Sequence, residues 1–285
     1  VVGDRAFAAF AKTNTIMVFD ISVGIRAKPR GFSWDSAYKQ FDELKPVLIK
    51  EISLPAPGRI RQYGPDRLVA VSGRDIVTID LKTYEVKTLI KDKLVNPLGL
   101  GTDAKGNLYI GEGAPLHQVF GYTPDGRRFL TLGKPGRREP GAFDNDNLEE
   151  PFGVEVASDG RVWVTEHTDW TRRVSIWDPQ TAKCVKAVYG PTQYGGDGCL
   201  DPADETRVFY KGMEFRRDPV TGTVTPLNMT YRADNTNIAS FIQGSALGED
   251  GNYPSYAFRA KGDLWFTSFM PPHGHPVLVL WLYKK

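Results

Sequence analysis

The chain contains 285 residues, 41% apolar and 25% charged, which is enough to bury a full hydrophobic core in one large domain. Its 36 basic and 34 acidic side chains leave a net charge of +2, which disfavours nucleic acid and anionic membrane surfaces as partners. No apolar run approaches about 18 residues, so the sequence predicts no membrane span.

The opening residues, Val1 to Gly3, include neither a methionine nor an apolar leader. We therefore expect a processed or excised part of a longer extracytoplasmic protein, periplasmic or secreted. Further along, residues 33–44 place four apolar side chains at helical spacing behind Ser33, which is a good N-terminal cap. This pattern predicts a short amphipathic helix that either closes one end of the fold or binds a partner.

A repeated pattern starts at Pro97 and again at Pro151, an offset of 54 residues (151 − 97). Each copy contains an apolar strand, a glycine turn and a second alternating strand that ends in a glutamate, Glu112 or Glu166. A unit of this length and pattern is typical of a β-propeller blade.

The pattern of the second strand occurs six times, which predicts six four-stranded antiparallel blades in one all-β domain over residues 1–285. Second strands are predicted at residues 6–10, 67–71, 107–110, 161–164, 207–210 and 263–266. Third strands are predicted at residues 16–20, 76–80, 118–122, 174–178 and 213–217, and fourth strands at residues 86–90, 128–132, 184–188 and 224–227.

The predicted blades also lead to expectations about which residues pack between blades and how the ring of blades closes. Tyr109, Trp163 and Trp265 occupy equivalent places in their strands, so we expect them to pack between adjacent blades. The first blade lacks a first strand, and residues 276–283 resemble a third strand with none after it. Because an open ring leaves unprotected strand edges, we expect segments outside this chain to complete the fold.

Residues 133–143, 151–166 and 173–179 together resemble the NHL repeat of six-bladed β-propellers. The resemblance is close over residues 95–190 and looser elsewhere, and this chain has Gly-Glu or Thr-Glu where the family usually has Ala-Asp. It implies a propeller whose relatives include scaffolds, carbohydrate or protein binders, and a few metal-dependent enzymes such as the peptidylglycine amidating lyase. Residues 263–267 also resemble the blade signature of the streptogramin lyase propellers.

The loops between second and third strands are expected to open on one face of a propeller, and they contain all four histidines of the chain. Loop residues on a rigid scaffold often carry function. The predicted ligand-binding residues are Glu112, His117, Glu166, His167, Asp169, Trp170 and Arg172, and the predicted metal ligands are His167, His273, His275 and Glu166.

Each of these assignments has a structural alternative. His117 lies where such repeats carry a residue that hydrogen-bonds the neighbouring blade. Residues 144–150 offer carboxylates and amides for calcium, but they lack the spacing and glycine of a calcium loop, which favours a solvated turn.

Two functions are compatible with these loop residues. The first is a non-catalytic module that recognises a glycan or a protein through these loops. The second is a lyase or hydrolase that uses a divalent metal, zinc or calcium, held by the histidines and glutamates. The sequence contains no Gly-x-Ser-x-Gly elbow, phosphate-binding loop or dinucleotide motif, which disfavours serine hydrolysis, nucleotide use and hydride transfer.

Overall fold

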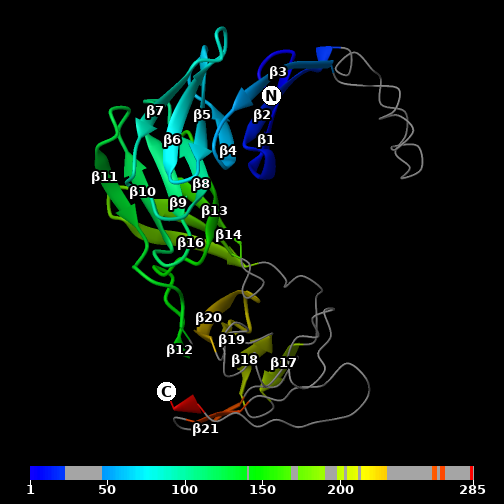
Figure 1. Ribbon diagram of the computed structural model, residues 1–285. Helices are drawn as coiled ribbons and strands as arrows, with labels where there is room; N and C mark the ends of the chain where they lie inside the picture. Colours follow the sequence, from blue (N-terminus) through cyan, green and yellow to red (C-terminus); the bar gives the residue numbers. More distant parts are fainter. Residues whose placement is uncertain are drawn as a thin grey trace, which may run out of the picture.

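The computed structural model describes residues 1–22, 47–139, 141–167, 173–189, 198–201, 204–210, 213–229, 259–261, 264–266 and 283–284. These residues form six antiparallel β-sheets, and their one helical element of three residues or more is the 3-10 turn Ala11–Thr13 (Figure 1). The predicted all-β fold is therefore confirmed. No helix of the described residues is long and apolar enough to cross a membrane.

The first three sheets follow the chain order. Sheet 1 contains β1 (Arg5–Phe10), β2 (Thr15–Asp20) and β3 (Val47–Ser53). Sheet 2 contains β4 (Pro57–Gln62), β5 (Arg67–Ser72), β6 (Asp75–Asp80) and β7 (Val86–Ile90). Sheet 3 contains β8 (Pro97–Thr102), β9 (Leu108–Glu112), β10 (Gln118–Tyr122) and β11 (Arg128–Leu132).

Sheet 4 contains β13 (Pro151–Val156), β14 (Val162–Glu166), β15 (Arg173–Asp178) and β16 (Lys183–Tyr189). Sheet 5 contains β17 (Gly198–Asp201), β18 (Asp204–Tyr210), β19 (Met213–Arg217) and β20 (Val224–Met229), with β12 (Gly141–Ala142) added beside β20. Sheet 6 contains β21 (Arg259–Lys261), β22 (Leu264–Phe266) and β23 (Tyr283–Lys284).

The predicted strand order holds in these sheets. Each of the six predicted second strands lies in a different sheet, at β1, β5, β9, β14, β18 and β22. The predicted third strands correspond to β2, β6, β10, β15 and β19, and the fourth strands to β7, β11, β16 and β20. The repeat was readable because alternating apolar residues, broken by glycine turns, dictate a meander of short strands.

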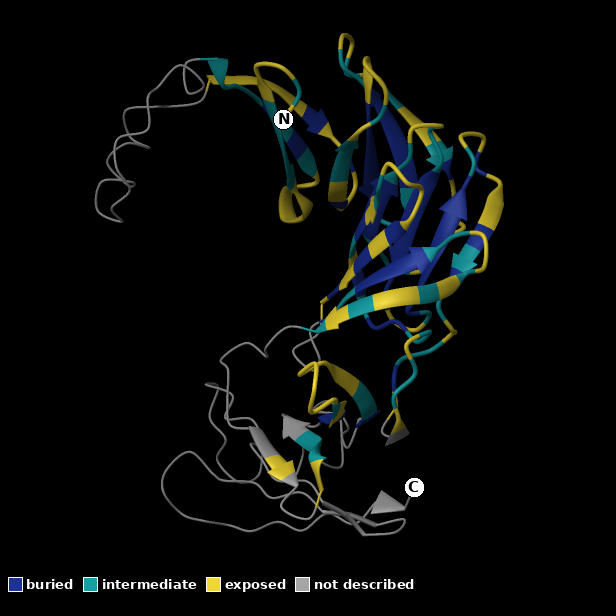
Figure 2. Ribbon diagram, turned by 180° about the vertical axis from the view of Figure 1, so that it is seen from behind, coloured by how far each residue is buried: buried dark blue, intermediate teal, exposed yellow. Residues whose placement is uncertain are grey.

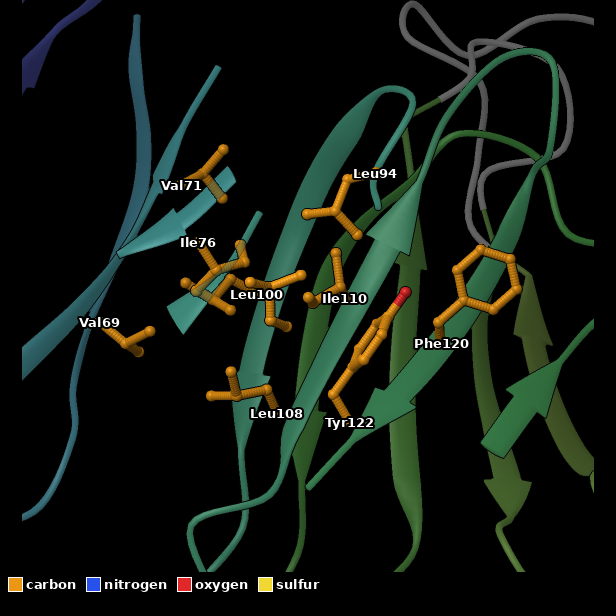
Figure 3. Packing of buried hydrophobic residues seen from close by; sticks show 10 residues of the cluster. Val69, Val71, Ile76, Leu94, Leu100, Leu108, Ile110, Phe120 and Tyr122 are labelled. Carbon is orange, nitrogen blue, oxygen red and sulfur yellow. The ribbon is translucent and has the colours of Figure 1, made fainter. Parts of the chain in front are cut away.

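Sheets 1 to 4 pack face to face, with β1 against β4, β4 against β8, and β8 against β13 (Figure 1). Alternation along one strand serves two interfaces. Leu108 and Ile110 of β9 face sheet 2, whereas Tyr109 between them faces sheet 4. Figure 2 shows the buried residues concentrated in these packed sheets, and Figure 3 shows the cluster in which Ile76 of β6 meets Leu100 of β8.

The contact between sheets 3 and 4 is unusually close because sheet 3 presents glycines to β13. A Cβ atom on Gly99 would lie 2.8 Å from Cγ2 of Val154, and one on Gly101 would lie 2.5 Å from the carbonyl oxygen of Val154. A Cβ atom on Gly111 would overlap the carbonyl oxygen of Pro151. The backbone of β13 therefore lies directly on β8 and β9, a spacing that only glycine permits at these positions.

The prediction of equivalent packing holds for Tyr109 and is wrong for Trp163. Tyr109 is 4% exposed and belongs to the cluster between sheets 3 and 4, whereas Trp163 is 42% exposed. Val162 and Val164 point toward sheet 3, so the alternation of β14 directs Trp163 to the opposite face. Within the described residues, no hydrophobic cluster covers that face. Trp265 lies in β22, and its side chain is outside the described part of the chain.

Sheet 5 is joined to the rest through the segment that precedes sheet 4. Gly141 pairs with Met229 and Ala142 with Asn228, so β12 extends the outer edge of sheet 5. Beside it, the ring of Phe143 packs edge-on against Tyr189 at 5.8 Å. The sequence pattern did not predict this added strand.

The remaining expectations concern the first blade, the predicted helix and the last predicted strand. Among the described strands of sheet 1, β1 lies at one edge, and the expectation of an incomplete first blade stays a prediction. The predicted helix at residues 33–44 and most of the predicted strand at residues 276–283 lie outside the described residues.

Replacing Gly111 by alanine should destabilise the protein by about 3 kcal/mol or more, because the new methyl group would force β13 off β9. The matched control is Gly160→Ala, where φ is +81° but nothing lies within 4 Å, so only the backbone cost of about 1 kcal/mol is expected. Urea unfolding of both variants measures the difference. Equal losses would contradict the close packing of the two sheets.

Candidate ligand site at the mouth of the inner strands

In sheets 2, 3 and 4, the second strand ends beside the proline that begins the first strand. Ser72 pairs with Pro57, Glu112 with Pro97, and Glu166 with Pro151. The predicted site residues Glu112 and Glu166 thus occupy equivalent positions at the end of the sheets where the second-to-third loops begin. We call this end the loop face.

Each of these three side chains binds the segment that leads into its own sheet. The Ser72 hydroxyl donates to the carbonyl of Pro55 at 2.9 Å. The Glu112 carboxylate accepts the backbone N–H of Asn96 at 2.6 Å and that of Val95, and Glu166 accepts the N–H of Glu149 at 3.1 Å. The shared role is structural, because the group replaces the backbone partners that a loop lacks.

Glu166 also forms a buried ionic cluster with two arginines. Arg138 donates to its Oε2 atom, and Arg173 donates to Oε1 at 2.7 Å. The side chains of all three residues are 2% exposed or less. Burial alone would lower the pKa of Arg173, but the charge of Glu166 and its hydrogen bonds raise that pKa. The carboxylate proposed as a metal ligand is therefore already neutralised by two guanidinium groups.

Among the described residues, no arginine or lysine side chain lies at hydrogen-bonding distance from the Glu112 carboxylate. Burial raises its pKa, and the backbone N–H groups of Asn96 and Val95, together with the charge of Arg74, oppose this rise in part. The carboxylate is fully buried, so it faces the interior of sheet 3 rather than the surface.

His117 connects sheet 3 to the segment before sheet 4, as the structural alternative for this residue requires. Its ring is 4% exposed, and its Nδ1 atom accepts the backbone N–H of Glu150 at 3.2 Å. The Glu150 carboxylate in turn lies 3.4 Å from Nδ1 and accepts the N–H of Ala114. Both His117 and Glu150 adopt positive φ values, which the surrounding hydrogen bonds must hold in place.

The turn at residues 144–150 is likewise occupied by protein contacts. Asp144 binds Lys134, and Asp146 accepts from Lys183 at 2.7 Å and from the backbone N–H of Cys184. Burial alone would raise the pKa values of both carboxyls, but the lysine contacts hold the pKa values below their usual range. Among the described residues, no group of three or more His, Cys, Asp or Glu is arranged to hold a metal ion.

The exposed part of the loop face comes from bulges at the start of the inner strands. In sheet 4, Phe152 is the extra residue between Pro151 and Gly153, and in sheet 2 the bulge contains Arg59. Bulges re-aim side chains away from the regular alternation. Phe152 is 37% exposed, and the guanidinium carbon of Arg59 lies 4.0 Å from the centroid of its ring.

His167 completes this group. Its ring lies against Phe152, with 5.0 Å between centroids and an angle of 31° between planes, and its backbone N–H donates to the carbonyl of Glu150 at 2.9 Å. Deeper along the inner strands, Arg61 pairs with Glu155 and donates to the carbonyl of Leu100 at 3.0 Å. Sheets 2 and 4 thus meet across β8 through cationic, aromatic and acidic side chains.

Of the predicted site residues, only His167 lies in this exposed group. Glu112, His117 and Glu166 are buried in the scaffold, and Asp169, Trp170, Arg172, His273 and His275 lie outside the described residues. Arg59 and Phe152 were missed. The available signal was a departure from the repeat, because Arg59 replaces the glycine found at Gly99 and Gly153 in the Pro-x-Gly pattern.

No family model and no curated protein matches the chain. Among solved structures, it is similar to a hydrazine synthase from Kuenenia stuttgartiensis, with 16% sequence identity, a TM-score of 0.39 and 80% of this chain covered. The match covers 60% of that protein's chain, so this chain spans less than two thirds of its length.

Replacing Glu166 by glutamine should cost about 3–5 kcal/mol of stability, because Arg173 would remain fully buried without this counter-charge and Arg138 would lose its ion pair with the carboxylate. The control is Glu155→Gln, whose ion pair with Arg61 is largely exposed and should cost about 1 kcal/mol or less. Urea unfolding of the two variants at neutral pH measures both losses. Similar small losses would contradict a structural role for Glu166.

The raised pKa of Glu112 predicts a dependence of stability on pH. Its carboxyl is protonated in both states below the unfolded pKa, so its contribution is full there and is lost as the pH rises through the folded pKa. A glutamine cannot titrate. The difference in unfolding free energy between Glu112→Gln and wild type should therefore shift in the variant's favour as the pH rises above the ordinary pKa of a glutamate. A constant difference would contradict this.

Proposed function

We propose that this chain is a ligand-binding module, a six-bladed β-propeller of the NHL type that recognises a glycan or a protein through its loop face. Its six antiparallel sheets, its meander order and its 54-residue repeat (151 − 97) support the propeller part of the proposal. An extracytoplasmic location as part of a longer chain belongs to the same proposal.

The observation that carries the proposal is the exposed Phe152 ring between Arg59 and His167. The exposed part of this ring offers an apolar contact for a sugar ring or a side chain. The guanidinium group beside it is suited to bind a carboxylate by two parallel hydrogen bonds. The combination favours an acidic glycan, such as one that contains uronic acids, over a neutral one.

None of the described features supports the metal-dependent lyase or hydrolase as strongly as the exposed group supports a binding module. Glu166 is committed to Arg138 and Arg173, and a catalytic base or ligand must be free to reach the reacting group. The enzyme alternative would therefore depend on His167 together with residues outside the described part of the chain.

The test is titration calorimetry with defined oligogalacturonates, neutral oligosaccharides of equal length and an acidic peptide. We expect the acidic oligosaccharide to bind most tightly, with an affinity that falls as salt is added. Phe152→Ala should weaken this binding about tenfold, and Arg59→Gln should remove most of its salt dependence.

Phe10→Ala is the matched control, since Phe10 is 41% exposed on β1 and should leave binding unchanged. Preference for the peptide would support a protein ligand at the same residues. Binding that ignores Phe152→Ala and Arg59→Gln would show that the loop-face group is not the site. Elemental analysis of the purified protein provides the separate test of the enzyme alternative, for which a stoichiometric divalent metal, zinc or calcium, would be required.

A further inference from the structure

A concave surface lies at the end of sheets 3 and 4 opposite the loop face. It is a cavity of about 510 Å3, within the range of small-molecule sites. Its lining comes from the turn between β8 and β9, the turn between β13 and β14, and the turn between β15 and β16. In a meander these turns lie at the end away from the second-to-third loops, so this cavity is separate from the loop-face group.

The cavity has an aromatic wall. Phe129 of β11 is 46% exposed, and its ring meets Tyr109 edge-on at 6.0 Å and 88°. The ring reaches this place because it lies over Gly121, where a Cβ atom would be only 2.9 Å from Cζ of Phe129. Val156 and Pro179 of sheet 4 form the facing apolar side. An exposed ring in a fixed orientation is the platform that a sugar ring can stack on.

The polar groups of the cavity are held in two different ways. Asp103 is fully engaged, because it accepts the backbone N–H groups of Lys105 and Asn107 at 2.9 Å, the Asn107 amide at 2.8 Å and the Tyr109 hydroxyl at 3.4 Å. By contrast, the Gln180 amide and the Lys105 ammonium make no side-chain hydrogen bond within the described part of the chain. The Gln180 amide can donate to and accept from ligand hydroxyls, and the Lys105 ammonium can donate to them.

The charge of the lining is balanced, since Asp103 and Lys105 are its two ionised residues and carry opposite signs. Burial, together with the nearby Asp103, raises the pKa of Tyr109 to about 12, so its phenol stays neutral. A charged ligand would gain little here and would lose hydration. The combination of a ring platform, amide and hydroxyl partners and no net charge describes a site for a neutral polyhydroxylated ring.

We propose that this cavity between sheets 3 and 4 is a second ligand site, which binds a neutral hexose unit against Phe129. The proposal goes beyond the loop-face function and does not depend on it. The two sites differ in the charge that they favour and in the residues that they use.

The test is titration of the whole chain with methyl glucoside, methyl galactoside and methyl mannoside, with glucuronate as the anionic counterpart, by calorimetry and saturation-transfer NMR. At least one neutral glycoside should bind saturably with a Kd below about 10 mM, and in the Arg59→Gln variant, which lacks the loop-face cation, glucuronate should bind more weakly than that glycoside. Phe129→Ala should weaken the binding about tenfold, and Gln180→Ala, at an exposed turn, about threefold.

Phe10→Ala, at an exposed ring on β1 outside both sites, is the control and should bind the glycoside as wild type does. The proposal is overturned if no neutral glycoside binds saturably, if glucuronate still binds more tightly than all of them in the Arg59→Gln variant, or if Phe129→Ala and Gln180→Ala both bind neutral glycosides as wild type does. None of these outcomes affects the oligogalacturonate result at Phe152, so the two proposals can fail separately.

Discussion

The close approach of β13 to β8 and β9 is the constraint on which the described sheets depend. A propeller-like stack requires consecutive sheets to converge at their inner strands, and a side chain on Gly99, Gly101 or Gly111 would hold them apart. Because these residues are glycines, the backbone of β13 contacts the backbones of β8 and β9. Larger residues elsewhere on the two sheets can then fill the space between them. Tyr109 and Trp177 occupy that space between sheets 3 and 4.

This convergence creates the polar arrangement at the loop face. Where inner strands meet closely, the segments that lead into them lose access to water and need internal hydrogen-bond partners. Ser72, Glu112 and Glu166 supply these partners from equivalent positions, and the buried charge of Glu166 requires Arg138 and Arg173 in turn. The same position thus holds a hydroxyl, a carboxylic side chain bonded to backbone N–H groups, or a carboxylate in an ionic cluster.

The sequence predicts the fold well and the site poorly, for one physical reason. Strand order follows from apolar alternation and glycine turns, which are local features that repeat along the chain. The sequence alone therefore predicts the positions of β5, β9 and β14. Burial of a polar side chain depends on what lies across the sheet interface, which the local pattern does not contain. Glu112 and His117 therefore resembled surface ligands in sequence, although each is committed to a backbone partner. Trp163 was misjudged for the same reason, because its burial requires a neighbour that the repeat implies but cannot position.

Both proposed ligand sites arise where the chain departs from its own repeat. Arg59 stands where the inner strands of sheets 3 and 4 have glycine, and Phe129 is a large aromatic residue at a bulge of β11, where it lies exposed over Gly121. A repeated position is under the same packing demand in every blade, so its residue type reports the scaffold. A position that breaks the pattern while remaining exposed costs stability or solubility without serving the packing. In a repeat protein of this kind, the exposed exceptions to the repeat are therefore better guides to ligand sites than the histidines and glutamates that first draw attention.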